Sequence, residues 1–167
     1  MNTLKVIKDK EFPTDESTLE IRETSRGVFI NENRLVPLLF ASNCGIHELP
    51  GGGIEAGEDR LAGLVREVLE EAGGEIKIIQ ELGQIVEYRS QINRKQISYC
   101  YFGTIKQVAV PQYTEEELRD GTTLEWLPID EAISKVRSDQ SADYEGSFIK
   151  ERDLFLLELV NQTLIAN

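Results

Sequence analysis

The stretch that decides the fold runs from Gly52 to Gly74 and reads GGIEAGEDRLAGLVREVLEEAGG. It opens in a run of glycines, where a regular element must end and the backbone is free to turn. Beyond Asp59, apolar residues recur at the three- and four-residue spacings of an amphipathic helix: Leu61, Leu64, Val65, Val68, Leu69 and Ala72. Asp59 is a suitable N-cap, and Gly73 followed by Gly74 is a suitable stop. The sequence therefore predicts a glycine-rich turn that leads into a helix.

Carboxylates gather on one side of this predicted helix. At about 100° per residue, Glu67, Glu70 and Glu71 share an arc of about 100° that points nearly opposite the apolar residues. We therefore expect all three side chains to face away from the core. Like charges at these spacings repel one another, and a hard cation such as Mg²⁺ would offset the repulsion. Arg66 falls beside Glu70, so we expect it to orient carboxylates through charge-assisted hydrogen bonds. The alternative is a solvated acidic face with a weak surface ion pair.

Length and charge describe one ordinary globular domain. The chain has 167 residues, which fits a single domain over residues 1–167. Its formal net charge is −12. A chain this acidic has no general attraction for nucleic acid or anionic membrane, so neither is an expected partner. A phosphate compound would need a local cation in order to bind.

The compartment is predicted from the amino terminus and the cysteines. The first residues lack the apolar segment of a secretory signal, and no apolar run approaches the roughly 18 residues of a membrane span. Cys44 and Cys100 are too far apart in the chain to form a CxxC pair, so a disulfide scaffold is not expected. The sequence therefore predicts a cytoplasmic protein with reduced thiols.

Other segments predict a mixture of strands and helices. Residues 1–24 are polar apart from one short apolar stretch, and residues 109–123 read as a loop. Alternating or continuous apolar runs predict strands at residues 27–30, 35–42, 76–89, 96–105 and 124–127. Asp130 is expected to cap a short helix, and a final apolar helix follows a polar loop at residues 138–147. Since no repeating βαβ rhythm is present, we predict an α/β fold with a mixed sheet between helices.

The spacing of fixed residues in the turn and helix carries a resemblance. From Gly52 to Gly73 the residues follow the pattern G-x5-E-x7-R-E-U-x-E-E-x-G, where U is apolar, and this resembles the signature of the NUDIX hydrolase family. Gly74 stands where the family has a further apolar residue, and we expect Ile76 to fill that space. The resemblance implies an α/β/α sandwich with a mixed β-sheet, in which the signature forms a loop, a helix and a second loop.

The same resemblance implies a reaction and a metal site. NUDIX hydrolases cleave a nucleoside diphosphate linked to another moiety by attack of water at phosphorus, usually with Mg²⁺ or Mn²⁺. Matched by position, Glu67, Glu70 and Glu71 correspond to the metal-binding acids of the family, and Gly52 corresponds to its opening glycine. Gly52 and Gly53 let the backbone approach a ligand closely. We therefore expect both to bind substrate, and Gly52 to join the metal shell through its carbonyl group.

A water nucleophile also benefits from a carboxylate that removes its proton. The candidates are Glu70 in the helix and an acidic loop in which Glu116 and Glu117 are preferred, because a carboxylate free of metal is the better base. Arg89 belongs to a small basic cluster on the predicted hairpin loop and is a candidate contact for substrate phosphates, although a solvated loop is the favoured interpretation. His47, the single histidine, is either a substrate contact or a structural residue.

Several substrate classes stay open at this level. A nucleoside triphosphate, including an oxidised one, is favoured over ADP-ribose or a nucleotide sugar, because Ser90 stands where ADP-ribose hydrolases of the family carry a proline. A second alternative is a non-catalytic module that senses a nucleotide, although every acidic position of the signature is retained. The expected partner is a small nucleotide, and a homodimer is kept as a further alternative.

Overall fold

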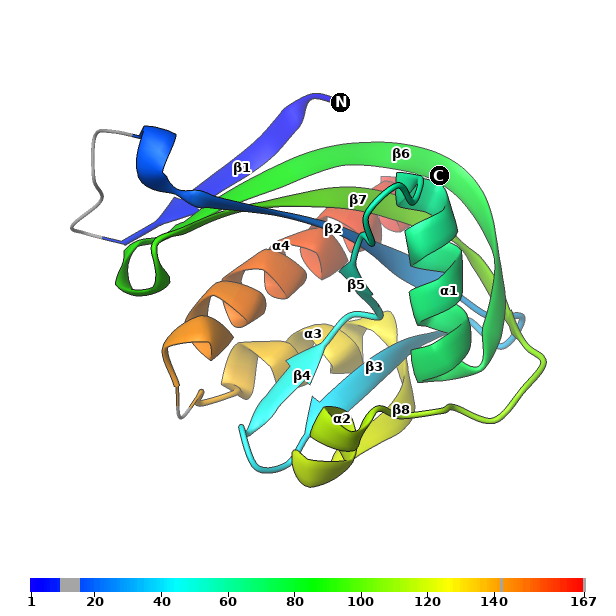
Figure 1. The fold of residues 1–167 in the computed structure, drawn as a ribbon. Helices are drawn as coiled ribbons and strands as arrows, with labels where there is room; N and C mark the ends of the chain where they lie inside the picture. Colours follow the sequence, from blue (N-terminus) through cyan, green and yellow to red (C-terminus); the bar gives the residue numbers. More distant parts are fainter. Residues whose placement is uncertain (10–15, 142, 167) are drawn as a thin grey trace.

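The computed structural model describes residues 1–9, 16–141 and 143–166, which contain two β-sheets and four α-helices (Figure 1). A five-stranded sheet has the strand order β1-β6-β7-β2-β5, and a three-stranded sheet has the order β4-β3-β8. The strands are β1 (Thr3–Lys8), β2 (Glu20–Ile30), β3 (Leu35–Ala41), β4 (Ile46–Glu48), β5 (Gly51–Gly53), β6 (Gly74–Arg89), β7 (Arg94–Gln107) and β8 (Thr122–Pro128). The helices are α1 (Arg60–Ala72), α2 (Glu115–Arg119), α3 (Ile129–Ser138) and α4 (Tyr144–Ala166), with 3₁₀ turns η1 (Glu16–Thr18) and η2 (Ser90–Ile92).

The larger sheet is mixed. β6 and β7 form a long antiparallel hairpin, whereas β1 pairs with β6, and β2 with β7, in parallel. The predicted strands at residues 27–30, 76–89 and 96–105 all lie in this sheet, and the predicted loop between the last two is the hairpin turn. Apolar runs bounded by turn residues predicted these strands.

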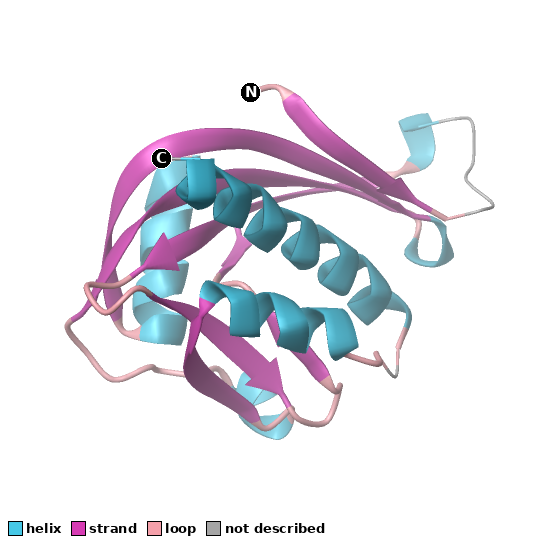
Figure 2. Cartoon of the chain, turned by 180° about the vertical axis from the view of Figure 1, so that it is seen from behind, coloured by secondary structure: helices cyan, strands magenta, loops and turns pink. Residues whose placement is uncertain are grey.

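Helices cover both faces of the larger sheet. Alternate residues of a strand point to opposite sides, so one strand contributes to the packing on both faces. On one face, Leu64 and Val68 of α1 pack with Phe29 and Tyr101. On the other face, Val28 belongs to the main core with residues of α3 and α4: Ala132, Ile133, Val136, Phe148, Leu156, Leu157 and Val160. α3 and α4 lie side by side (Figure 2). The predicted α/β fold with a mixed sheet and flanking helices is therefore confirmed.

Both ends of α1 form as the sequence predicts. The Asp59 side chain accepts hydrogen bonds from the backbone N–H groups of Leu61 and Ala62, and Gly73 ends the helix at φ 61°. The room expected for an apolar residue at Gly74 is filled by Ile105 and not by Ile76, because a Cβ on Gly74 would lie 2.3 Å from the Ile105 side chain. That expectation about Ile76 was wrong, since the space is defined by the neighbouring strand β7.

The buried face of α1 is narrower than the apolar pattern suggests. Leu64, Val68 and Ala72 are buried, whereas three predicted core residues are 40%, 43% and 42% exposed: Leu61, Val65 and Leu69. Glu71, expected on the outer face, is only 9% exposed. The prediction that all three clustered carboxylates face away from the core is therefore wrong for Glu71. The helical wheel places this residue near the buried arc but does not show that β5 covers it.

Other differences concern short elements. The predicted loop over residues 109–123 contains α2, which begins after Thr114. Pro128, and not Asp130, precedes the first residue of α3, and Asp130 instead accepts a hydrogen bond from Asn161. The polar amino-terminal segment supplies β1 and the first residues of β2, which the sequence did not predict as strands. No helix within the described ranges has the length and hydropathy needed to cross a bilayer.

Candidate active site

The glycine strand β5 forms the edge from which the candidate site is built. It pairs antiparallel with β2, so that Gly51 lies opposite Arg26 and Gly53 opposite Thr24. The Gly51 N–H donates a hydrogen bond of 2.7 Å to Oε2 of Glu71. A Cβ on Gly52 would lie 2.5 Å from the carboxylate carbon of Glu67. A side chain at residue 52 would therefore displace the Glu67 carboxylate, which fills that space.

Arg66 holds the carboxylates of the signature in place. Its Nε and Nη2 donate to Glu58 at 3.0 and 2.9 Å, and its Nη1 donates to Glu67 Oε1 at 2.7 Å. Nη2 also donates to the Gly53 carbonyl at 3.1 Å, and Glu70 lies 3.6 Å from Nη1. The hydrogen bonds from Arg66 lower the pKa of Glu58, and those to Glu58 raise the pKa of Arg66. These are the charge-assisted contacts that the predicted orienting role of Arg66 requires.

The Glu71 carboxylate is buried, and burial of its charge costs free energy. Burial raises its pKa well above the ordinary value, while the Gly51 N–H and Arg26 act in the opposite direction. The charges of Glu67 and Glu48 raise the pKa further. A buried anion surrounded by other anions destabilises the protein unless a cation compensates it.

A cavity of about 460 Å³ opens beside β5. Glu67 and Glu71 line it at one place, and Glu116 and Glu117 of α2 line it at another. Its remaining charged lining comes from β2, β4, β6 and α4 and from nearby loops: Arg22, Arg26, Glu48, Arg89, Asp120, Asp143, Glu145 and Arg152. Glu70 is not among the described lining residues, and its side chain is 47% exposed beside Arg66. The structure thus brings together Glu67, Glu71 and the α2 acids but leaves Glu70 outside the cavity.

The two general-base candidates on α2 have different surroundings. The Glu117 carboxylate accepts hydrogen bonds from the N–H and hydroxyl of Thr114 at 2.6 and 2.7 Å. The Glu117 N–H donates to the Thr114 hydroxyl oxygen at 3.3 Å, which completes a capping box. Glu116 also lines the cavity, and its exposed side chain makes no hydrogen bond or ion pair with any described residue. The Glu116 carboxylate is therefore available to accept a proton. The Glu117 carboxylate caps the amino terminus of α2 through Thr114.

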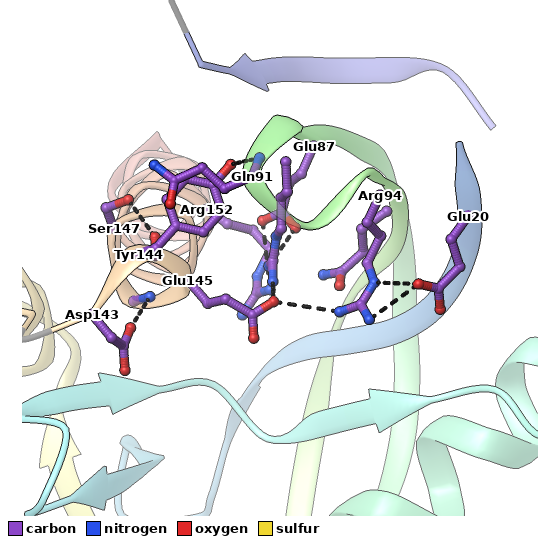
Figure 3. Close-up of polar contacts among 12 residues, drawn as sticks. Glu20, Glu87, Gln91, Arg94, Asp143, Tyr144, Glu145, Ser147 and Arg152 are labelled. Carbon is purple, nitrogen blue, oxygen red and sulfur yellow. Dashed lines mark hydrogen bonds and ion pairs between the residues drawn. The ribbon is translucent and has the colours of Figure 1, made fainter. Parts of the chain in front are cut away.

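Arg89 lies in an ionic network and not on a solvated loop. It is 3% exposed, its Nη2 donates to Glu87 at 2.8 Å, and its Nη1 donates to Glu145 at 2.8 Å. Figure 3 shows Glu145 directed from α4 toward Arg94, which in turn pairs with Glu20 of β2. Arg89 lines the cavity, as a substrate contact would, but two of its nitrogen atoms already have carboxylate partners.

His47 is held by carboxylates. Its Nδ1 lies 2.8 Å from Asp139 Oδ1, its backbone N–H donates to the other oxygen of Asp139, and its ring stacks on Phe40. It is 7% exposed and is not part of the described cavity lining. Of the two alternatives left open, the structural one describes His47.

The donor chemistry at the edge of β5 fits a hard divalent cation. Glu67 and Glu71 offer carboxylate oxygens, and β5 adds backbone carbonyl groups, which are ligands that Mg²⁺ and Mn²⁺ accept. The close approach of Glu67 to Gly52 forms a cradle that a Cβ would fill. Within the described part of the chain, no group of three or more acidic, histidine or cysteine side chains is gathered into a complete cluster.

Comparison with known proteins places the chain in a family. Residues 22–147, which are most of the chain, match the NUDIX domain. The chain therefore belongs to the NUDIX domain family, as the signature around α1 predicts.

Curated relatives align over part of their length. Diphosphoinositol polyphosphate phosphohydrolase 3-beta from Bos taurus is 33% identical over 85 residues, which are 51% of this chain and 49% of that protein. Diphosphoinositol polyphosphate phosphohydrolase 2 from Homo sapiens is also 33% identical over 85 residues, which are 44% of its length. The chain thus spans about half the length of the curated relatives it matches.

Solved structures share the fold at low identity. The E. coli ORF135 protein superposes with a TM-score of 0.62 and 18% identity, over 89% of this chain and 94% of that one. The MutT NUDIX hydrolase from Burkholderia pseudomallei superposes with a TM-score of 0.54 and 16% identity, over 79% of this chain and 97% of that one. These similarities concern the fold.

Outside the signature, sequence reasoning named Arg89, Glu116 and Glu117 but missed other charged residues of the cavity. Arg22 and Arg26 belong to β2, whose first half was not predicted as a strand, so nothing indicated that they share a face. Glu48 ends β4 and lies 4.0 Å from Arg26, and burial raises its pKa. A period-two reading from residue 20 onward would have placed Arg22 and Arg26 together.

Proposed function

We propose that the chain is a metal-dependent pyrophosphohydrolase that cleaves a nucleoside diphosphate linked to another moiety. The observation that carries the proposal is the arrangement at β5, where Arg66 positions Glu67 beside Gly52 and Glu71 is held by Gly51 at the wall of a cavity. Carboxylates oriented in this way offer oxygens to a divalent cation, and the cavity has room for a nucleotide. Family membership supports the same chemistry.

Each residue of the site has a role in this proposal. Glu67 and Glu71 hold Mg²⁺ or Mn²⁺, with the Gly52 carbonyl and Glu70 as the further ligands that the signature implies. When bound, the cation lowers the pKa of water and offsets the charge of phosphoryl oxygens. Arg66 orients the carboxylates, and Gly53 allows the substrate to approach the backbone.

A base and a basic wall complete the proposed site. Glu116 removes the proton from the attacking water, with Glu117 and Glu70 as the other candidates. Support for Glu116 is its unpaired carboxylate among the described residues of the cavity. Arg89 lies at the basic wall as a substrate contact, where its Nε has no acceptor among the described residues.

A nucleoside triphosphate, including an oxidised one, is the substrate class we favour. The names of the curated relatives suggest a polyphosphorylated inositol as another candidate. The charge of the described cavity lining argues against so many phosphates, because four arginines face eight carboxylates: Glu48, Glu67, Glu71, Glu116, Glu117, Asp120, Asp143 and Glu145. ADP-ribose and nucleotide sugars carry fewer charges and stay as the alternative class.

The test is product analysis with purified protein and a panel of phosphoanhydrides. The panel contains nucleoside triphosphates, 8-oxo-dGTP, ADP-ribose, a nucleotide sugar and a diphosphoinositol polyphosphate, each with Mg²⁺, with Mn²⁺ and with EDTA. We expect a nucleoside triphosphate to give a monophosphate and pyrophosphate, with activity lost in EDTA. Binding of a nucleotide without turnover would support the sensing module instead, and activity undiminished by EDTA would overturn the metal role.

Location and assembly belong to the same proposal. Cys44 and Cys100 are free thiols, which supports a reducing compartment such as the cytoplasm.

The exposed stripe of Leu61, Val65 and Leu69 on α1 is a surface on which a second copy of the chain would pack. Light scattering after size-exclusion chromatography decides between monomer and homodimer.

A further inference from the structure

Two arginines of β2 lie on one wall of the cavity. Arg22 and Arg26 are four residues apart, so their side chains point to the same face of the sheet, and both line the cavity. Thr24 lies between them on the same face and donates a hydrogen bond to Ser98 of β7 at 2.9 Å. This face of β2 is therefore polar where it meets the cavity, although the next residue on the same face, Val28, is in the core.

The arginines around Arg22 all have partners. Arg89 pairs with Glu145 and Glu87. Arg94 pairs with the same Glu145 and with Glu20 (Figure 3). Arg152 pairs with Asp153 at 2.7 Å and lies 3.6 Å from Glu87. Arg26 donates to the Leu49 carbonyl at 2.8 Å and lies 4.0 Å from Glu48.

Arg22 differs from these neighbours. Its guanidinium makes no hydrogen bond or ion pair with any residue in the described ranges, although it faces a cavity rich in carboxylates. Burial, followed by the charges of Arg94, Arg26 and Arg89, lowers its pKa. Arg22 is an exposed residue of the cavity lining, and three neighbouring arginines act on its charge.

Two other arginines of the cavity lining also carry unused donors. The Nε atoms of Arg26 and Arg89 are buried and have no hydrogen-bond acceptor within the described part of the chain. Arg26 is 8% exposed and Arg89 is 3% exposed, so these N–H groups are withdrawn from solvent. An unpaired buried donor costs free energy, and an anion that accepts from it removes that cost.

Arg22 lies next to the glycine strand. A Cβ on Gly53 would lie 3.9 Å from Arg22 Nη2, whereas a Cβ on Gly52 would meet Glu67 at 2.5 Å. Successive residues of a strand present opposite faces. Glu67 therefore occupies one side of β5 and the Arg22 guanidinium approaches the other, with only glycine between them.

We propose that Arg22, with the Nε of Arg26 as a second donor, binds a phosphoryl group of the substrate beside Gly53 and so determines specificity for an anion at that place. The inference rests on the proposed function for the presence of a phosphoanhydride. A guanidinium offers paired donors that match phosphoryl oxygens, which a lysine ammonium matches less well. Because carboxylates outnumber arginines in the described lining, removal of one arginine should affect affinity strongly.

The experiment measures binding of imidodiphosphate, a non-hydrolysable analogue of pyrophosphate, by calorimetry in Mg²⁺. We expect Arg22→Gln to weaken binding about ten- to hundredfold, the range for a charge-assisted hydrogen bond, and Arg22→Lys to be intermediate. Arg137→Gln is the matched control, because it removes the same charge from a surface pair with Glu158. It should bind as the wild type does. A thermal melt of each variant checks the fold.

Kinetics with whichever nucleotide is hydrolysed separates binding from chemistry. Arg22→Gln should raise KM by a similar factor and lower kcat much less. If wild type and Arg22→Gln bind imidodiphosphate within twofold of each other, or if neither binds it, the anion site at Arg22 is refuted. If Arg22→Gln weakens binding but no phosphoanhydride is hydrolysed by the wild type, the anion site stands and the proposed hydrolysis fails.

Discussion

The backbone N–H of Gly51 donates a 2.7 Å hydrogen bond to Glu71, which fixes a carboxylate of α1 beneath the glycine strand β5. The bond explains why Glu71 is buried although its neighbour Glu70 is exposed. It also places a charge where burial raises the pKa of the carboxyl group. This bond therefore joins the glycine strand directly to the acidic helix.

Substitution of Glu71 by glutamine should separate catalysis from stability. In Glu71→Gln the amide keeps an oxygen that accepts from Gly51, but a buried charge and a ligand for the cation are lost. We expect kcat to fall by about a hundredfold or more. In EDTA, Tm should rise by about 2–4 °C, because roughly 1 kcal/mol of desolvation cost is relieved. Activity assays and calorimetry in EDTA measure the two effects.

Glu32→Gln is the control for this substitution, because Glu32 is exposed in the turn between β2 and β3. It should leave both kcat and Tm at wild-type values. Wild-type turnover in a folded Glu71→Gln protein would remove Glu71 from the metal site.

Alanine at the two neighbouring glycines tests the cradle around Glu67. A Cβ at residue 52 would lie 2.5 Å from the Glu67 carboxylate, whereas a Cβ at residue 53 would have ordinary contact at 3.9 Å. Gly52→Ala should therefore displace Glu67 and weaken the apparent Mg²⁺ affinity about 10- to 100-fold. Gly53→Ala should keep the wild-type Mg²⁺ affinity. Equal Mg²⁺ titration curves for the two variants would show that Glu67 does not hold the cation.

The sequence predicted the parts of the site that one continuous motif contains. The spacing from Gly52 to Gly73 fixes the helix, its caps and the acidic residues, since all of these are local. It did not predict the burial of Glu71, because the strand that covers Glu71 comes from outside the helical wheel. Arg22 was missed for the same reason, since its cavity face depends on pairing of β2 with β7.

The sequence also contains a signal for the start of α2. Thr114 and Glu117 have the S/T-x-x-E spacing of a capping box, which predicts the start of a helix where a loop was expected. That spacing also distinguishes Glu117, whose carboxylate closes the box, from Glu116. A local rule applied to the sequence alone could therefore have ranked the two acids.

The pair of Glu58 and Arg66 should make stability depend on pH. Hydrogen bonds from Arg66 lower the pKa of Glu58 in the folded state. A lowered pKa contributes stability above the unfolded value of about 4.3, and this contribution is lost as pH falls through the folded value. Tm of the wild type should therefore exceed that of Glu58→Gln at pH 6 and converge with it in acid. A difference in Tm that stays constant down to pH 3 would contradict this linkage.

Glu116→Gln should identify the general base. The Glu116 carboxylate faces the cavity without a partner among the described residues, while Glu117 is engaged by Thr114. Loss of a general base typically lowers kcat by about 10²- to 10⁴-fold. We expect Glu116→Gln to show such a loss with unchanged Mg²⁺ affinity and without the acidic limb of the pH–rate profile. Glu117→Gln should keep that limb and lower kcat less, since it changes the cap of α2. If both variants retain kcat within about threefold of wild type, which is far below that range, the base is Glu70 or another group.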